Sequence, residues 1–393
     1  MLNVYLNDNV TDIYFRFIRF ALGVYEGREF VDGSALKDFD WTAFYEFAQK
    51  QTLTGVVFDG VQRVSKPVAP RLDLLMQWFA VSRKIGQRNS VLNGATVALY
   101  ERVKAAGCSC CILKGQANAA LYPNPAARIP GDVDVWVNAG REVIRSLASA
   151  LAKADNGQVE EESFNHIGLS LNGIAVELHY TPGFMANFVY NRRLQRWLKT
   201  NVDGQCRNRV DLPDDVGEVA APTLAFNAVY QLYHLYHHYF YEGVGLRQVV
   251  DYYFVITMLN VELKIGDHRV CQSEMLNFLQ NELKHLGLWK FAGAVMYVLH
   301  RVMALAEAKM IAPMDVKRGR MLLEDILNGG NFGHYDERYA FGHGAVGHNF
   351  RRLWRDLRLV RYYPAEAFSE PVFRVWHFLW RKSNKSFSEQ KGA

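Results

Sequence analysis

GDVDVWV, residues 131–137, carries the strongest indication of the fold. Its apolar and acidic residues alternate with the period of two that is typical of a strand with one buried face. The valines then point to a hydrophobic core, and Asp132 and Asp134 project together from the opposite face. Two carboxylates this close repel each other unless a cation neutralises them. The stretch predicts a strand that presents two acidic ligands, although such alternation also occurs on solvated strand faces.

A third carboxylate, Glu177, lies in the later stretch IAVELHY, residues 174–180. Its apolar neighbours would face the core, so Glu177 shares the other face with His179. If this strand pairs beside the strand of Asp132, the three carboxylates converge. Such oxygen ligands suit Mg²⁺, with Mn²⁺ as the alternative, because these ions complete their shells with water and substrate phosphates. Three carboxylates can hold two ions that act on a phosphoryl transfer.

The segment before the acidic pair has features of a phosphate site. In ILKGQANAALYPNPAARIPGD, residues 112–132, an apolar strand ends at Leu113 and a turn at Lys114 and Gly115 opens a short helix. Backbone N–H groups at a helix start bind phosphate, and glycine allows close approach. Lys114 adds a positive charge, and Arg128 can bind phosphate through two nitrogens. The alternatives are a solvated strand end for Lys114 and a loop salt bridge for Arg128.

These motifs together resemble a known family. The order of strand, glycine turn, short helix, G-D-x-D strand and later acidic strand is similar to that of the polymerase-beta-like nucleotidyltransferase superfamily. Within it, the stretches ILKG, LYPNPAARIPGDVDVWV and VELHY resemble the bacterial uncharacterised nucleotidyltransferase family, as does EGVGLRQVVDYY further along. The resemblance implies that Asp132, Asp134 and Glu177 are catalytic, metal-binding carboxylates and that Gly115 belongs to the phosphate turn. The chain has Lys114-Gly115-Gln116 where the superfamily usually has Gly-Ser or Gly-Gly, and Glu177 where Asp is commoner.

The rest of the chain is predicted to be mostly helical, so the fold class is α+β, with a small mixed sheet forming the nucleotidyltransferase core. We expect an N-terminal helical region packing on the core at 1–106, the core at 107–212 and a C-terminal helical domain at 213–393. Asp40 is placed to cap a helix, and a longer helix is predicted from Leu72 to Ala106. The dipeptide Asn172-Gly173 is typical of a two-residue hairpin turn.

A polar face is predicted on the helix that contains Tyr230, His234, His237, His238 and Tyr241, because these residues recur at spacings of three and four. On the next helix, Arg247 and Asp251 are four residues apart and can pair. We expect this region to close over the nucleotide with Arg247 near the phosphates. The alternative is a hydrogen-bonded helix interface, and a histidine metal site is disfavoured because no further ligand completes it.

Composition excludes several classes of protein. No apolar run reaches the roughly 18–20 residues of a membrane span, and the first residues lack the features of a secretory signal, so we expect a cytoplasmic protein. The five cysteines form no disulfide framework. Cys110 and Cys111 lie in an apolar run and are expected to be buried strand thiols, with a metal site for the cluster Cys108, Cys110 and Cys111 as the alternative. The formal net charge of +5 permits a phosphate-bearing partner without demanding one.

The sequence therefore predicts a metal-dependent nucleotidyltransferase that moves a nucleoside monophosphate from an NTP to a small-molecule or protein acceptor. A non-catalytic nucleotide-binding module is a second hypothesis, supported by the altered glycine turn. An RNA-directed enzyme that extends tRNA is a third, because the C-terminal stretches FRRLWRDLRLVRYY and FRVWHFLWRKSNK mix arginine with aromatic residues. These stretches also fit helices on a membrane surface or, more simply, helices that pack on the body.

Overall fold

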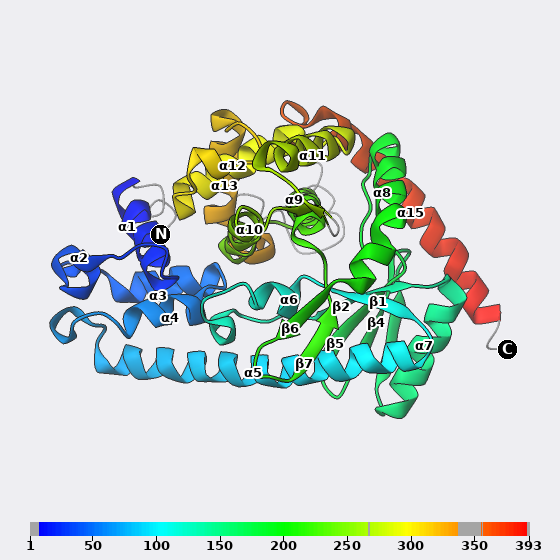
Figure 1. Cartoon of the computed structure of the whole chain (residues 1–393), viewed down its shortest axis with the longest axis horizontal. Helices are drawn as coiled ribbons and strands as arrows, with labels where there is room; N and C mark the ends of the chain where they lie inside the picture. The colour runs from blue at the N-terminus through cyan, green and yellow to red at the C-terminus, as the bar shows by residue number, and fades with distance from the viewer. Residues whose placement is uncertain (1–7, 266–267, 337–354, 356, 391–393) are drawn as a thin grey trace.

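The computed structural model describes the whole chain except residues 1–7, 266–267, 337–354, 356 and 391–393 (Figure 1). Helices dominate, and a mixed sheet of five strands lies towards one end of the molecule. The α+β class with a small sheet in a mostly helical chain is confirmed. The longer helices are α1 (Asp8–Ala21), α3 (Trp41–Lys50), α4 (Thr54–Val61), α5 (Leu72–Ala105), α7 (Arg141–Ala154), α8 (Phe188–Arg207), α9 (Leu224–Tyr241), α10 (Leu246–Leu259), α11 (Gln272–His285), α12 (Trp289–Met303), α13 (Val316–Gly329) and α15 (Pro364–Gln390).

Short helical turns and small strands complete the chain. The short helices are α2 (Arg28–Val31), η2 (Ser34–Leu36), η3 (Lys66–Val68), α6 (Gly115–Ala119), η4 (Pro125–Ala127), η5 (Glu307–Lys309) and η6 (Asn331–Gly333). Two separate hairpins are formed by β6 (Arg209–Leu212) with β7 (Gly217–Ala220) and by β8 (Lys264–Ile265) with β9 (His268–Arg269). Within the described ranges, no helix has both the length and the apolar character that crossing a membrane requires.

The five-stranded sheet has the order β1-β2-β5-β4-β3. Its strands are β1 (Ser109–Leu113), β2 (Val133–Asn138), β3 (Gln158–Glu162), β4 (His166–Leu171) and β5 (Ile174–His179). The central pair β2 and β5 is parallel, and the other pairs are antiparallel. Asn172 and Gly173 both have positive φ, 49° and 75°, as a two-residue hairpin turn requires, so the predicted hairpin is confirmed.

The two faces of the sheet have different partners. On one face, Val133, Val135 and Val137 pack with side chains from α5 and α7, as the alternation in the sequence predicts. On the other face, the ring of Trp136 stacks on Phe226 of α9, with the ring centroids 5.9 Å apart. Because side chains alternate along β2, the acidic residues lie on this second face, which looks towards the helical half.

Helix α5 connects the halves of the molecule and runs along its length (Figure 1). Its bounds agree with the predicted helix to within one residue. The predicted cap of α3 is also confirmed, since the Asp40 carboxylate accepts a hydrogen bond of 2.9 Å from the N–H of Ala43. Buried side chains of α1, α3 and α4 join the same hydrophobic core as those of α9 to α13. The division of the chain at residues 106 and 212 stays a prediction.

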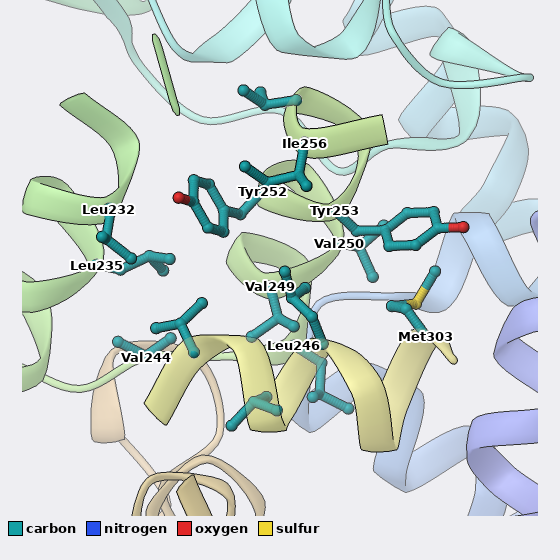
Figure 2. Close-up of a cluster of buried hydrophobic side chains, with 14 of the residues drawn as sticks. Leu232, Leu235, Val244, Leu246, Val249, Val250, Tyr252, Tyr253, Ile256 and Met303 are labelled. Carbon is teal, nitrogen blue, oxygen red and sulfur yellow. The ribbon is translucent and has the colours of Figure 1, made fainter. Parts of the chain in front are cut away.

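The helical half is built around buried apolar side chains from α9, α10 and α12. Figure 2 shows Leu232 and Leu235 of α9 facing Val249 and Tyr252 of α10, with Met303 at the end of α12. These five side chains are almost completely buried. This packing fixes α10 beside α9 and so determines where the polar residues of both helices lie.

The C-terminal stretch FRVWHFLWRKSNK lies in α15, along the outer side of the sheet region (Figure 1). Phe373 and Trp376 contact the ring of Phe164, which lies between β3 and β4. The helix therefore packs on the body, as the simplest interpretation predicted, while Val372 and Leu379 are exposed. Part of the other basic stretch, FRRLWRDLRLVRYY, lies at residues 350–354 and 356, outside the described residues. In its described part, Leu359 and Tyr363 are buried in the core of the helical half.

Candidate active site

The three predicted carboxylates come together on the second face of the sheet. Asp134 of β2 is directly opposite Glu177 of β5 in the parallel pair. Asp132, just before β2, completes a group whose ligand atoms all lie within 4.8 Å of one another. Asp134 is buried, Glu177 is half-buried, and Asp132 is exposed at the mouth of a cavity. The condition set by the sequence, that the two strands be neighbours, is met.

Two cationic side chains neutralise the most buried carboxylate. The Lys114 Nζ lies 3.0 Å from Asp134 Oδ2, and His179 Nε2 lies 2.8 Å from Asp134 Oδ1 and 3.2 Å from Glu177 Oε2. Although burial opposes ionisation, Lys114 and His179 hold the pKa of Asp134 well below its usual value. Burial lowers the pKa of His179, but the hydrogen bonds to Asp134 and Glu177 outweigh it and raise the pKa to about 9. The neighbouring charge of Asp134 raises the pKa of Asp132.

The turn between β1 and α6 brings the side chain of Lys114 and the backbone of Gly115 to the cavity. Lys114 has φ 51° and Gly115 has φ 36°, a conformation that favours glycine. A methyl group on Gly115 would lie 3.5 Å from the carbonyl oxygen of Asp132. Gln116 points away from the cavity and donates to Asn89 and Asn93 of α5. The position where the superfamily usually has a serine therefore contributes to the packing of α5.

The predicted phosphate-binding arginines lie side by side with one acidic partner. Arg128 donates to Asp251 through Nε and Nη2, at 2.7 and 2.8 Å, and Tyr122 donates to the same carboxylate at 2.6 Å. The pairing of Arg247 with Asp251 expected from their spacing is corrected, because the carboxylate is taken by Arg128 from the η4 loop. Arg247 Nη1 instead donates to the carbonyl oxygen of Ile129 at 2.9 Å.

This group carries a surplus of positive charge. Arg128 and Arg247 supply two charges and Asp251 cancels one. Among the described residues, Arg128 Nη1 and Arg247 Nε are buried without a hydrogen-bond partner. Burial and the neighbouring Arg128 lower the pKa of Arg247. An anion in the cavity would relieve both the unpaired donors and the repulsion.

The carboxylates and arginines line the same cavity of about 310 Å³, which lies between the sheet and the helical half. The histidine face predicted on α9 forms its far wall. His234 Nε2 lies 3.4 Å from Lys114 Nζ and 2.8 Å from His238 Nε2, and His238 Nδ1 lies 2.8 Å from a Glu242 carboxylate oxygen. Burial lowers the pKa of His237 to about 3. Among the described residues, neither group of three potential metal ligands includes a histidine of α9.

The donor set fits a hard divalent cation. Asp132, Asp134 and Glu177 offer carboxylate oxygens that border an open cavity, so an ion held there has room for water and for substrate oxygens. The predicted alternative at the cysteine cluster has no comparable geometry among the described residues. Cys110 and Cys111 are buried in β1, as expected of strand thiols, and burial raises the pKa of both.

Sequence reasoning missed one neighbour of the carboxylates, His166, and one buried ion pair, Arg128 with Asp251. The ring of His166, from β4, lies beside His179, and its Nε2 is 3.5 Å from Glu177 Oε1. The hairpin turn contained the information, because pairing Leu171 with Ile174 and counting outwards places His166 opposite His179. Arg128 and Asp251 are 123 residues apart, and no sequence pattern predicts their ion pair.

The geometry can be compared with known proteins. The family model described as uncharacterised nucleotidyltransferase matches residues 37–289, more than half of the chain. The chain belongs to this family. The predicted resemblance is confirmed, and membership of the uncharacterised nucleotidyltransferase family makes the protein a transferase of nucleotidyl groups. The matched range includes β1, α6, β2 and β5, which position the carboxylates, and α10, which carries Arg247.

Other comparisons add little to this assignment. A crystal structure of an antigenic nucleotidyltransferase-like protein from Paracoccidioides brasiliensis is 16% identical in sequence, covers 61% of this chain and 98% of its own, and superposes with a TM-score of 0.34. A likeness at this TM-score carries no argument about the site. None of the curated proteins matches the chain.

Proposed function

We propose that this member of the uncharacterised nucleotidyltransferase family uses Mg²⁺, with Mn²⁺ as the alternative, to transfer a nucleoside monophosphate from an NTP to an acceptor, releasing pyrophosphate. The observation that carries the proposal is the convergence of Asp132, Asp134 and Glu177 from neighbouring parallel strands. Two further features of the same cavity support it, the glycine turn at Gly115 and the surplus positive charge at Arg128 and Arg247.

The carboxylates are assigned distinct tasks. Asp132 and Asp134 would hold the metal, and Glu177 would bind metal and help to remove a proton from the acceptor hydroxyl. The bound cation would supply charge neutralisation to the phosphates and make the acceptor oxygen a better nucleophile. Lys114 and His179 keep Asp134 and Glu177 ionised, which is the form that a cation requires.

The phosphates are assigned to the turn at Gly115 and to Arg247, which line the same cavity. The N–H groups of the turn at Gly115 would approach the triphosphate, because the glycine leaves its surroundings open apart from the carbonyl of Asp132. Since α6 has only five residues, the exposed N–H groups matter more than a helix dipole. Arg247 would bind a phosphate oxygen through its unpaired nitrogen, and Arg128, held by Asp251, would keep Arg247 in place.

The acceptor is proposed to be a small molecule or a protein, which would enter along the α9 wall. His234 and His237 on this wall are half-buried, and desolvation lowers the pKa of both. Neutral rings of this kind can accept or donate one hydrogen bond at each nitrogen, so they suit a hydroxyl-bearing acceptor. RNA is the alternative acceptor, and it would make affinity fall steeply with salt.

The experiment is a transfer assay with NTPs labelled at the α-phosphate, Mg²⁺ and a cell extract as the source of acceptors. Label is expected in a small-molecule or protein fraction with the unmodified protein and is expected to fall at least a hundredfold with Asp132→Asn or Asp134→Asn. Asp211→Asn, on an exposed position of β6, is the matched control and should keep full activity. Full activity in both site variants would refute the assignment. Nucleotide binding without any transfer would favour a non-catalytic binding module.

A further inference from the structure

A second group of potential ligands lies directly beside the carboxylate triad. His166 of β4 and His179 of β5 are partners in the antiparallel register, and their ring centroids are 5.3 Å apart. Both rings direct Nε2 at Glu177, with distances of 3.5 Å from His166 to Oε1 and 3.2 Å from His179 to Oε2. The ligand atoms of the three side chains lie within 4.8 Å of one another. Adjacent strands therefore present two imidazoles and a carboxylate to one point. An ion bound there would take the place of the Nε2 proton with which His179 contacts Asp134 and Glu177, and it would neutralise the same carboxylates.

The simpler explanation is that both histidines only support the fold through hydrogen bonds. A structural histidine in a protein interior normally uses both ring nitrogens, because a buried polar atom without a partner costs free energy. Here the Nδ1 atoms of His166 and His179 are buried and have no hydrogen-bond partner among the described residues. Their contacts are concentrated on the Nε2 side, where Glu177 and Asp134 lie. Each ring therefore makes these contacts through Nε2, which is the nitrogen that would bind an ion held between the two rings and Glu177.

The spacing of the donor atoms suits a first-row transition ion. Zinc binds imidazole nitrogen and carboxylate oxygen at about 2.0–2.1 Å, which in a tetrahedral site separates the ligand atoms by about 3.3 Å. The observed contacts of Glu177 with the two rings, 3.2 and 3.5 Å, bracket that separation. Imidazole ligands favour zinc and its neighbours in the series over Mg²⁺, which prefers oxygen ligands alone.

We propose that His166, His179 and Glu177 form a transition-metal subsite, distinct from the oxygen-only Mg²⁺ position at Asp132 and Asp134. The subsite depends on the proposed function only because Glu177 also belongs to the proposed Mg²⁺ site. The protein would then hold two ions of different chemistry, one selected by nitrogen ligands and one by carboxylates. Asp134 lies between them, since it contacts His179 and belongs to the acidic triad.

The test separates the two positions by titrating Zn²⁺ and Mg²⁺ separately into the metal-free full-length protein and following the heat of binding. His166→Ala is expected to weaken Zn²⁺ binding at least tenfold and to leave Mg²⁺ binding within twofold. Asp132→Asn should do the reverse, because Asp132 belongs only to the oxygen set. His285→Ala, an exposed histidine on α11, is the matched control and should change neither affinity.

Equal Zn²⁺ affinity in His166→Ala and the unmodified protein would overturn the subsite. If His166→Ala does not fold, the test is instead the visible absorption spectrum of Co²⁺ bound to the unmodified protein. A spectrum with nitrogen ligation supports the subsite, and a spectrum of an oxygen-only ion overturns it. Because these measurements record binding alone, a failure of nucleotidyl transfer would leave them unchanged, and a failure of the subsite would leave transfer by Asp132 and Asp134 standing.

Discussion

Replacing Asp251 by asparagine removes the carboxylate that Arg128 binds through two nitrogens. Both side chains are buried, with exposed fractions of 4% for Arg128 and 7% for Asp251. The variant keeps the size of the side chain and one oxygen that accepts hydrogen bonds. It leaves the guanidinium groups of Arg128 and Arg247 near each other without a compensating charge, so we expect a large loss of stability.

The magnitude follows from two independent arguments. Removing one partner of a buried ion pair typically costs about 3–5 kcal/mol. Coulomb's law gives about 4 kcal/mol for unit charges about 4 Å apart at an effective dielectric constant of about 20. With an unfolding entropy of about 2.1 cal/mol/K per residue over 393 residues, 4 kcal/mol lowers the midpoint of a cooperative thermal transition by about 5 °C.

The assay is thermal unfolding of the two proteins by calorimetry at one pH and one protein concentration. Asp73→Asn is the matched control, because Asp73 pairs with Arg71 on the surface, where the two side chains are 68% and 87% exposed. Surface pairs contribute about 0–1 kcal/mol, so the control should shift the midpoint by about 1 °C or less. If Asp251→Asn shifts the midpoint no more than Asp73→Asn, the buried ion pair does not stabilise this site.

Three further predictions concern other parts of the molecule. Burial raises the pKa of Glu366 from 4.5 to about 7, so the protonated side chain stabilises the fold by about 3 kcal/mol below about pH 4.5, and this stabilisation is lost as the pH rises through 7. The melting temperature of Glu366→Gln relative to the unmodified protein should therefore rise over that range. A constant difference between the two melting temperatures would contradict this prediction. Of the five free cysteines only Cys271 is exposed, so a thiol reagent should modify one rapidly and the rest after unfolding, whereas several fast thiols would contradict the burial. Gly115→Ala should weaken NTP binding about tenfold in calorimetry, because its φ of 36° strains alanine; an unchanged affinity would remove the turn from the site.

The sequence predicted the carboxylate triad because its information is local. The alternation around Asp132 and Asp134 placed both on one face, and the same reasoning placed Glu177 beside His179. The hairpin at Asn172-Gly173 followed from the conformational preferences of two residues. The parallel pairing of β2 with β5 brings these residues together. This pairing depends on the path of the chain through α7, β3 and β4, so the local pattern predicts the triad only on the condition that the two strands are neighbours.

The contacts of the cations were not predictable in the same way. Arg247 and Asp251 have the local spacing of a helical pair, yet the carboxylate binds Arg128, which follows η4. Its position depends on the packing of η4 against α4 and α5. Lys114 was expected to face phosphate, but the turn directs its Nζ to Asp134. Long side chains form contacts with groups that are distant in sequence, and a local sequence pattern does not predict these contacts.

The central claim is that the α-phosphorus of an NTP is the atom attacked. It is tested most directly by giving the protein Mg²⁺, a cell extract and one NTP that carries different labels on its α- and γ-phosphates. If the α-phosphorus is attacked, the α label will appear on the acceptor and the γ label in pyrophosphate, in equal amounts, and both products will be lost in Asp134→Asn. Transfer of the γ label to the acceptor, or equal turnover in Asp134→Asn, would contradict it.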